Sequence, residues 1–424
     1  MISFYSEILN FSNYLSLSFL KSNKTPIKIA FYNNCIRYGG IERVTSILLD
    51  YFSKESSFIF ILITTSGILD GEYPIPKNIK RISLLTQNTN VFEIIVKEKI
   101  DILVYNRDIN EEISLLNKLN NTKVIYTTHS SFFYRIYQND YNIEKTVYQE
   151  YKNCKYVTSL IPLENDYLFK RWGINSILLE NPCTFEYDSI EPSDLSKPNI
   201  IMIGRGDYFA KRFELGIISM KNIIQEISEC KMNIISSTTK NLEDLIKGLN
   251  LENSIKITGF QSNPEHYLKN ASLHIMTSLS EAYPMSLGEV KIFGIPSILC
   301  GLDYLILTKG GNIIIYDDNP DTIAKEAIKI LKNKRYRKRL GKEARKSMKK
   351  ISKNYIVKKW VKLFVSVYNG ISNFSYPRLF MNDYNIMTEK EANIILNNQL
   401  KLLKKRIKGF NNLTLEKLKS FHLS

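Results

Sequence analysis

Short runs of β-branched and other apolar residues alternate with longer stretches of helical periodicity along most of the chain. In the first half, the apolar runs are residues 27–33, 58–64, 101–105, 123–128, 156–160 and 176–182. Such alternation is typical of parallel α/β layers, because each strand needs a helical crossover to reach its parallel neighbour. We therefore predict a parallel sheet covered by helices in this half.

A polar, proline-containing stretch at residues 186–199 interrupts the pattern and predicts a linker. The alternation restarts after it, with apolar runs at residues 200–204, 232–237, 255–260, 272–278, 296–300 and 312–316. Two α/β domains joined by a linker are expected to face each other across a central cleft. Ligands of such sheets bind beyond the carboxyl ends of the strands, so the segments that follow these runs are the first places to look for a site.

Composition fits this picture of a globular protein. The chain has 424 residues, of which 44% are hydrophobic and 12% aromatic, enough for two domains. Its five cysteines are scattered without a Cys-x-x-Cys pair, and its four histidines lack metal-ligand spacing. We therefore expect a reducing compartment and no metal ion. The amino-terminal segment has no basic leader, and no apolar run reaches the roughly 20 residues of a spanning helix. We expect a cytoplasmic protein, soluble or peripheral at the inner face of a membrane.

The net charge of +16 is concentrated in one segment. Residues 332–362 contain fifteen Lys or Arg and a single acid, Glu343. One interpretation is a solvated helix face; the sharper one is a surface that meets anionic lipid headgroups or another polyanion. Nucleic acid is not expected as a partner, because no nucleic-acid-binding motif accompanies the charge.

Two segments of the first half place candidate ligand-binding residues after strands. Gly39 and Gly40 follow the first strand and precede a helix, where close backbone approach and free N–H groups suit an anion. His129, in "VIYTTHSSF", follows another strand at the expected cleft edge. Taken alone, each has a structural alternative, a tight turn for the glycines and a core position for the histidine.

The second half opens with "IIMIGRGDYFAKRFELGI", in which Gly204 ends a strand, Arg205 directly follows it, and Lys211 begins a helix. Arginine can bind two phosphate oxygens at once and lysine supplies a point charge, so this pair predicts a diphosphate clamp. The alternative is two exposed surface cations. The third glycine of a dinucleotide fingerprint is absent.

Two glutamates lie on either side of a strand–turn–helix corner in "SLSEAYPMSLGEVKIFGIP". Pro284 suits a first helical position, and Gly294 suits the residue after the last turn. Glu289, on this helix, is placed to accept hydrogen bonds from ribose hydroxyls, and Glu281, in the loop, can face a sugar. The alternatives are an exposed loop acid and a surface salt bridge.

In this order, these motifs resemble a retaining GT-B glycosyltransferase of family four (glycosyl transferases group 1). The matching segments, within residues 27–370, are "YGGIERV", "TTHSS", "NPCTF", "GRGDYFAKRF", "SLSEAYPMSLGEVKIFGIP" and "LGKEARKSM". The loop "GLDYLILTKGG" is an atypical version of its counterpart. The resemblance implies two Rossmann-like domains: an acceptor domain over 27–185, rejoined by a helix at about 351–376, and a donor domain over 199–350. Residues 1–26 and 377–424 are predicted to be extensions, the second helical.

The resemblance also implies transfer of a sugar from a nucleotide-diphosphate donor to an acceptor hydroxyl, with retention and without a metal ion. Arg205 and Lys211 would neutralise the departing diphosphate, assisted by Gly39 and Gly40. Glu289 would hold the ribose, Glu281 the donor sugar, and His129 would help to place it. The implied donor site also includes Gly204, Tyr283, Pro284, Met285 and Ser286.

The sequence specifies the donor and the acceptor less closely than it specifies the reaction. A uridine diphosphate sugar is favoured over guanosine diphosphate mannose, and a glycan or lipid-linked acceptor in surface polysaccharide synthesis is expected. Three alternatives stay open. They are a non-catalytic GT-B-like protein that binds nucleotide or glycan, a nucleic-acid-binding protein that uses the basic segment, and another α/β enzyme with a phosphate-bearing cofactor.

Overall fold

The computed structural model describes residues 26–37, 39–107, 111–138, 151–174, 176–206, 208–237, 240–351, 353–371 and 388–421. The predicted amino-terminal extension lies outside the described residues, apart from Pro26. The first part of the predicted carboxy-terminal extension, up to residue 387, also lies outside them.

The first domain is built on a seven-stranded parallel sheet with the order β3-β2-β1-β4-β5-β6-β7. Its strands are β1 (Ile27–Asn33), β2 (Phe58–Thr64), β3 (Lys80–Ser83), β4 (Ile102–Tyr105), β5 (Lys123–Thr127), β6 (Tyr156–Ser159) and β7 (Ser176–Leu178). Six of them confirm the predicted strands, although the run 176–182 gives a strand of only three residues. The edge strand β3 was not predicted, because its sequence, Lys-Arg-Ile-Ser, lacks an apolar run.

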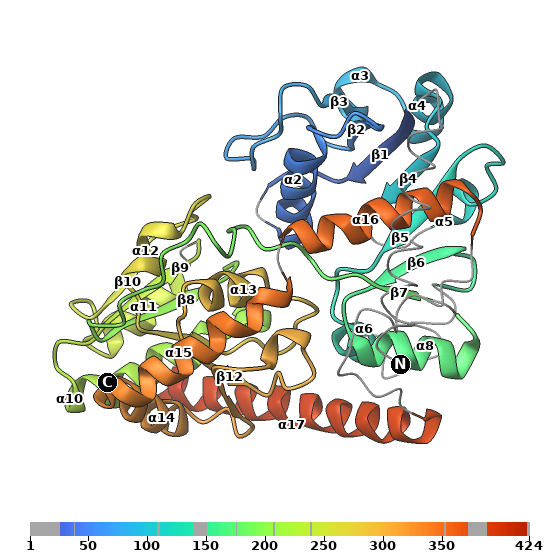
Figure 1. The fold of residues 1–424 in the computed structure, drawn as a ribbon. Coiled ribbons are helices and arrows are strands. Elements are labelled where there is room, and N and C mark those ends of the chain that lie inside the picture. The colour runs from blue at the N-terminus through green and yellow to red at the C-terminus, as the bar shows by residue number, and fades with distance from the viewer. Residues whose placement is uncertain are drawn as a thin grey trace, which may run out of the picture.

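The second domain repeats this arrangement with six parallel strands in the order β10-β9-β8-β11-β12-β13. The strands are β8 (Asn199–Ile203), β9 (Lys231–Ile235), β10 (Ile255–Ile257), β11 (Leu273–Met276), β12 (Ser297–Cys300) and β13 (Asn312–Ile315). All six were predicted, and the run 255–260 is shortened to residues 255–257. The molecule is thus an α/β protein with two Rossmann-like, parallel-sheet domains, as expected (Figure 1).

Helices connect the strands in both domains. Those of the first are α2 (Gly40–Phe52), α3 (Leu84–Gln87), α4 (Val91–Glu98), α5 (Glu111–Leu116), α6 (Phe132–Gln138) and α8 (Pro162–Trp172). Those of the second are α9 (Tyr208–Lys211), α10 (Phe213–Glu226), α11 (Lys240–Gly248), α12 (Glu265–Lys269), α13 (Met285–Ile292), α14 (Pro320–Lys332), α15 (Lys334–Met348), and the short 3-10 helices η2 (Ile306–Thr308) and η3 (Lys349–Ile351). Two helices follow, α16 (Lys353–Tyr368) and α17 (Glu389–Phe421).

The boundaries of α13 correct one detail of the sequence analysis. Pro284 is the N-cap of this helix and not its first helical residue. Gly294 has the expected left-handed conformation just beyond the last turn, with φ of +68°. The helix therefore starts one residue later than predicted, and its sides are almost entirely buried.

Helix α16 returns to the first domain, as predicted for residues 351–370. Phe364 is fully buried, and its ring packs against the rings of Phe52 and Trp360 with centroids 5.7 and 5.5 Å apart. The ring of Phe31 on β1 lies 6.0 Å from that of Trp360. The helix therefore lies against the first domain (Figure 1), where a cluster of aromatic side chains attaches it to the sheet.

Helix α17 lies along both domains (Figure 1). It packs against α6 and α8 of the first domain. Its buried side chains recur every three or four residues, as expected for one face of a helix: Leu396, Leu400, Leu403, Ile407 and Phe410. Phe410 belongs to the hydrophobic core of the second domain. The carboxy-terminal helix therefore bridges the two domains.

The basic segment 332–362 is not one continuous face, which corrects the sequence analysis. It is divided between α15, which packs on α13 in the second domain, and α16, which packs on the first. Three of its cations are used internally. Arg337 and Arg345 donate to main-chain carbonyls of the linker, those of Leu195 and Tyr187 among others, and Lys359 pairs with Glu180 at 2.6 Å. Only part of the charge is left for an external partner.

Candidate functional site

The strand order of each sheet reverses direction at one point, and the predicted site residues lie there. In the first domain the reversal lies between β1 and β4, and in the second between β8 and β11. The glycine loop follows β1, the Gly204–Arg205 segment follows β8, and the Glu281 loop follows β11. Crevices at such switch points bind the ligands of doubly wound sheets. The two domains therefore carry the candidate residues at equivalent edges.

The glycine loop lies close to the second domain. Gly39 is the N-cap of α2, and the carboxylate of Glu42 folds over it, so that a Cβ at position 39 would lie only 1.7 Å from Glu42 Oε2. Burial raises the pKa of Glu42, and the positive charge of Arg205 opposes that rise. Because it acts on Glu42, Arg205, an exposed residue of the other domain, is within electrostatic range of the glycine loop.

Lys211 and Glu281 lie together, which the sequence analysis did not foresee. The Nζ of Lys211 is 2.5 Å from Oε1 of Glu281, and both side chains are less than one-fifth exposed. The stem of Lys211 passes over Gly204, where an added Cβ would approach its Cδ to 3.1 Å. Gly204 thus leaves room for this lysine. Lys211, which was predicted to bind the diphosphate of a donor, and Glu281, which was predicted to bind its sugar, are therefore side by side.

Tyr304 supports the loop that carries Glu281. Its hydroxyl accepts a hydrogen bond from the backbone N–H of Glu281 at 3.0 Å and donates to the carbonyl of the same residue at 3.1 Å. Tyr304 belongs to the segment "GLDYLILTKGG", which differs from the usual sequence of this loop in the family. That difference is the sequence signal by which Tyr304 could have been identified. Its ring also contacts Phe133 of α6, with centroids 4.5 Å apart, which connects the loop to the first domain.

His129 lies at the same junction between the domains. Two residues after it, the hydroxyl of Ser131 contacts that of Ser280, the neighbour of Glu281. The histidine side chain is half-buried, and burial lowers its pKa to about 4. The imidazole is therefore neutral near pH 7, able to donate one hydrogen bond and accept another.

Glu289 is buried, contrary to the expectation that it faces an open cleft. It is 1% exposed and accepts a hydrogen bond from the Thr184 hydroxyl at 2.6 Å. Arg43 of α2 lies 2.9 Å from the same Oε1 and also donates to Thr184 at 3.0 Å. Arg43 was missed by the sequence analysis, although it lies one helical turn after Gly39. The carboxylate predicted to hold a ribose thus contacts a cation of the other domain in this structure.

The remaining predicted donor residues are mostly buried. Tyr283, Pro284 and Met285 are buried, and Ser286 is half-buried. They form the entry to α13, whose N-terminus has no side-chain cap. Free N–H groups at such a helix start can bind an anion. These residues therefore offer main-chain groups more than side chains to a ligand.

We expect Glu289→Ala to weaken two properties together. Donor affinity should fall by about 1–3 kcal/mol because ribose hydroxyls lose an acceptor, and the free energy of unfolding should fall by a similar amount because Arg43 loses its partner. Calorimetry and urea unfolding measure the two effects. The double variant Arg43→Ala/Glu289→Ala should regain stability but not donor affinity. Donor affinity unchanged in Glu289→Ala would contradict the ribose role.

Glu214, near the start of α10, is a buried acid beside the clamp. It is 7% exposed, and neither carboxylate oxygen has a hydrogen-bond partner among the residues that the structure describes. Burial raises its pKa to about 7, against an opposing effect of Arg212. The folded protein therefore binds a proton that the unfolded chain releases between about pH 4.5 and 7, so stability falls as the pH rises through this range.

The isosteric variant Glu214→Gln should remove this pH dependence. At pH 8 we expect it to be more stable than the wild type by about 1–3 kcal/mol, because the wild type must hold a buried charge there. At pH 4, below the ordinary pKa of a glutamate, the two proteins should be nearly equal. Urea unfolding at both pH values tests this prediction. Equal stabilities at pH 8 would show that the buried carboxylate of Glu214 has partners that stabilise its charge.

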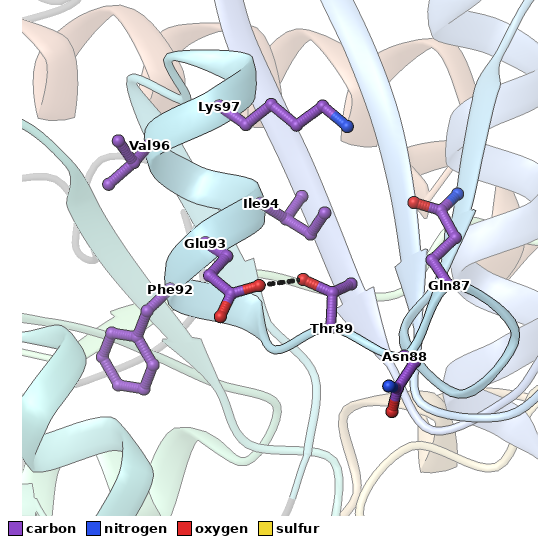
Figure 2. A pocket seen from close by; sticks show the side chains of 8 residues that line it. All are labelled: Gln87, Asn88, Thr89, Phe92, Glu93, Ile94, Val96 and Lys97. Atoms are coloured by element: carbon purple, nitrogen blue, oxygen red, sulfur yellow. Dashed lines mark hydrogen bonds between the residues drawn. The ribbon is translucent and has the colours of Figure 1, made fainter.

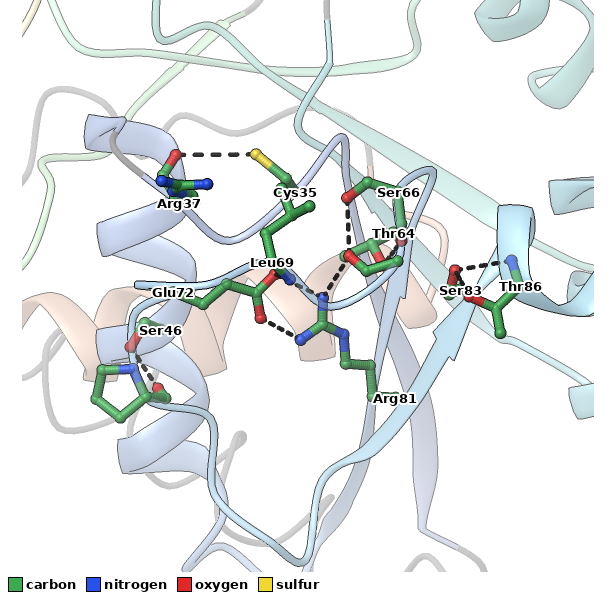
Figure 3. A network of polar contacts seen from close by, with 12 residues as sticks. Cys35, Arg37, Ser46, Thr64, Ser66, Leu69, Glu72, Arg81, Ser83 and Thr86 are labelled. Atoms are coloured by element: carbon green, nitrogen blue, oxygen red, sulfur yellow. Dashed lines mark hydrogen bonds and ion pairs between the residues drawn. The ribbon is translucent and has the colours of Figure 1, made fainter.

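A second polar network fixes the loop after β2, next to the glycine loop (Figure 3). Arg81 of β3 forms a two-bond ion pair with Glu72, with N–O distances of 2.5 and 2.9 Å. Burial favours a higher pKa for Glu72, but the hydrogen bonds and positive charge of Arg81, together with hydrogen bonds from the backbone, outweigh it and lower the pKa. Ser46 of α2 donates to the carbonyl of Pro74 at 2.6 Å. The network therefore holds this loop against α2.

A pocket in the first domain lies apart from these residues (Figure 2). Its lining comes from α3, α4 and the loop between them: Gln87, Asn88, Thr89, Phe92, Glu93, Ile94, Val96 and Lys97. Thr89 donates to Glu93 at 2.5 Å within it. The lining includes none of the predicted site residues.

Two features are absent from the described part of the chain. Its His, Cys, Asp and Glu side chains include no group of three or more arranged to hold a metal ion. Its helices include none that is long and apolar enough to cross a membrane.

The likeness of this chain to known proteins agrees with its two-domain fold. Residues 184–347 match the family model described as Glycosyl transferases group 1. A poly(glycerol-phosphate) alpha-glucosyltransferase of Bacillus subtilis is 26% identical over 160 residues, which cover 34% of this chain and 24% of the relative. The chain spans from 24% to 59% of the length of the curated relatives that it matches.

Solved structures resemble the chain over a longer range. Sucrose-phosphate synthase from Thermosynechococcus elongatus superposes with a TM-score of 0.64 and 14% identity, covering 81% of this chain and all of that one. HepE of Anabaena, in complex with UDP and glucose, gives a TM-score of 0.64 and 12% identity over 80% of this chain and all of that one. At such identities the likeness concerns the fold. The two domains that the structure describes therefore have the GT-B fold, and residues 184–347 match the glycosyl transferases group 1 family.

Proposed function

We propose that this protein transfers a sugar from a nucleotide-diphosphate sugar to an acceptor hydroxyl. The observation that carries the proposal is the pairing of Lys211 with Glu281 at 2.5 Å, at the switch point of the matched domain, with Arg205 close by. Cations there suit a diphosphate, and a carboxylate suits sugar hydroxyls. A donor that binds between them would separate the ion pair and replace it with its own groups.

Each residue of the site has its own role in the proposed reaction. Arg205 and Lys211 stabilise the negative charge that develops on the leaving diphosphate, assisted by the main-chain N–H groups at the start of α13 and by the Gly39–Gly40 loop. Glu281 orients the donor sugar. His129 is neutral near pH 7 because burial lowers its pKa, so it can accept or donate a hydrogen bond to the sugar.

The ribose role of Glu289 requires an exchange of partners. Its Oε1 contacts Arg43 and Thr184. Ribose hydroxyls would replace Arg43, which is carried by the other domain. Donor binding and the contact between the domains would therefore be coupled at this residue.

We further propose a hexosyl transfer with retention at the anomeric carbon, as in family four, and without a protein nucleophile or a metal ion. A UDP-sugar is favoured, because HepE of the same fold was solved with UDP and glucose. The relative from Bacillus subtilis is named for glucosyl transfer to poly(glycerol-phosphate), which supports a glycan or lipid-linked acceptor in a surface polymer.

A panel of nucleotide sugars tests the function. The purified protein should hydrolyse or transfer at least one of them, with release of nucleoside diphosphate, and EDTA should leave the rate unchanged because protein cations meet the phosphate charge. Retention is checked by the anomeric configuration of the product in NMR. Consumption of no donor would contradict catalysis and favour a binding protein, and loss of activity that manganese restores would contradict metal independence.

We also propose that the protein is cytoplasmic and associates with the inner face of a membrane through α15. Four exposed cations on this helix recur every four residues, Lys334, Lys338, Lys342 and Lys346, and Arg335 is a fifth beside them. This spacing places them along one side of the helix. Arg339 is paired with Glu343 at 2.8 Å, and Arg337 is buried, so neither contributes fully.

Binding to anionic vesicles should be modest and sensitive to salt. Each cation near such a surface contributes about 1 kcal/mol, and the interaction is screened over roughly 10 Å at 0.1 M salt. Phosphatidylglycerol vesicles should therefore sediment the protein at low salt, whereas phosphatidylcholine vesicles should not. The variant Lys338→Glu/Lys342→Glu should lose the effect, and equal sedimentation with both vesicles would contradict it.

A further inference from the structure

Arg406 of α17 enters the second domain beneath the loop that carries Glu281. The residue is 4% exposed. Its Nη1 donates to the carbonyl of Leu279 at 2.9 Å, and its Nη2 donates to those of Ser278 and Cys300 at 3.0 and 2.7 Å. These carbonyls follow β11 or end β12. One side chain thus joins the carboxyl ends of two neighbouring strands, just before the segment that bears Glu281.

The backbone beside β12 is shaped for this guanidinium. Gly301 has φ of +59°, and a Cβ at this position would lie 2.9 Å from Nη1 of Arg406 and 3.0 Å from its Cζ. A side chain there would meet both a strained backbone and the arginine. The close approach of Arg406 therefore depends on a glycine in the second domain.

The same helix also supports the segment that carries Lys211. Asp318 Oδ2 accepts a hydrogen bond from Arg406 Nε at 2.7 Å and another from Arg212 Nη1 at 2.7 Å. Arg212 is fully buried, has φ of +49°, and donates through Nε to the carbonyl of Thr277 at 2.9 Å. Its Cζ lies 5.5 Å from the centroid of the Phe410 ring, one turn further along α17.

Burying two guanidinium groups against one carboxylate is costly. Removing an ion from water costs several kcal/mol unless its hydrogen bonds are replaced. An apolar side chain would pack α17 without this cost, so the arginine is better explained by its directed bonds. The helix itself is held on the first domain by Leu396, Leu400 and Leu403, on the face that meets α6 and α8 (Figure 1).

We infer that Arg406 is a positioning residue of the donor site, which holds the Lys211 and Glu281 segments in their relative places from a helix outside the matched family domain. The inference rests on the proposed function for its consequence in catalysis. The contacts of Arg406 do not depend on it.

The test compares Arg406→Gln with Lys405→Gln, which removes the same charge from the exposed side of the same turn. Hydrogen exchange of the ligand-free protein should be faster at residues 277–282 and 300–303 in Arg406→Gln only. Turnover of the donor found in the panel should fall about 10- to 100-fold, the range that a misplacement of about 1 Å can cause. Binding of UDP alone should change much less, because Arg205 and Lys211 are retained.

Arg406→Lys should recover only part of the turnover, because an ammonium cannot make the forked contact with three carbonyls. If Arg406→Gln fails to fold, Gly301→Ala serves instead, since it displaces the guanidinium without removing its charge and should loosen the same loop. Wild-type exchange and turnover in Arg406→Gln would overturn the inference. A wild-type protein that consumes no nucleotide sugar would contradict the proposed function, while exchange would still test the positioning by Arg406.

Discussion

Arg205→Ala and Lys211→Ala should each lower turnover about 10²- to 10³-fold, equivalent to roughly 3–4 kcal/mol. In the proposed reaction the negative charge on the diphosphate grows as the glycosidic bond breaks, so these two cations would matter more in the transition state than in the bound donor. Turnover should therefore fall by more than the Michaelis constant rises. Steady-state kinetics with the donor found in the panel measure both constants.

The two variants differ in what else they disturb. Arg205 is exposed, so its loss should leave stability unchanged, whereas loss of Lys211 also removes the partner of Glu281. The double variant should lose less than the sum of the two, because both cations act on one diphosphate. Lys256→Ala, on the edge strand β10, is the control for loss of a surface charge. Near-normal turnover of Arg205→Ala at saturating donor would identify Arg205 as a surface cation.

Phe364→Ala should lower the free energy of unfolding by about 3–5 kcal/mol, as expected for removing a fully buried aromatic side chain. Its ring is surrounded by those of Phe31, Phe52, Phe58, Phe60 and Trp360, with centroids between 5.5 and 6.4 Å away. The cavity would open between α16 and the sheet of the first domain, so the returning helix should detach more easily.

Urea unfolding followed by tryptophan fluorescence suits this test, because Trp360 contacts Phe364 directly. Lys358→Ala, on the exposed side of the same helix, should change stability by less than about 0.5 kcal/mol. A loss below about 1 kcal/mol for Phe364→Ala would mean that α16 is not docked on the first domain in solution.

The alternation of apolar runs determined the two-domain parallel architecture, because a buried parallel strand must be apolar on both faces and each crossover needs a helix. Of the thirteen strands in the part of the chain that the structure describes, twelve were predicted in this way. The exception, β3, has a lysine and an arginine in four residues. It is a strand only because β2 offers it an unpaired edge, and that pairing is a tertiary contact.

The sequence also indicated the candidate site, because Gly39, Arg205 and Glu281 lie in segments that follow strands, at the carboxyl edges of the two parallel sheets. What each carboxylate contacts was decided by the tertiary structure. Glu289 meets Arg43, and Glu281 meets Lys211, through residues far apart in the chain. A pattern of spacing predicts which edge of a sheet a side chain reaches, but not which charge from another element neutralises it.

The carboxy-terminal helix also has some features that the sequence determines and others that only the tertiary structure decides. Its apolar spacing, from Leu396 to Phe410, is sufficient to predict an amphipathic helix. Nothing local distinguishes Arg406 from the lysines around it, since all are long cations on one helix. Only the packing of α17 across both domains places this guanidinium against the ends of β11 and β12. Periodicity along the chain therefore determined the elements, and long-range packing decided which buried charges support the site.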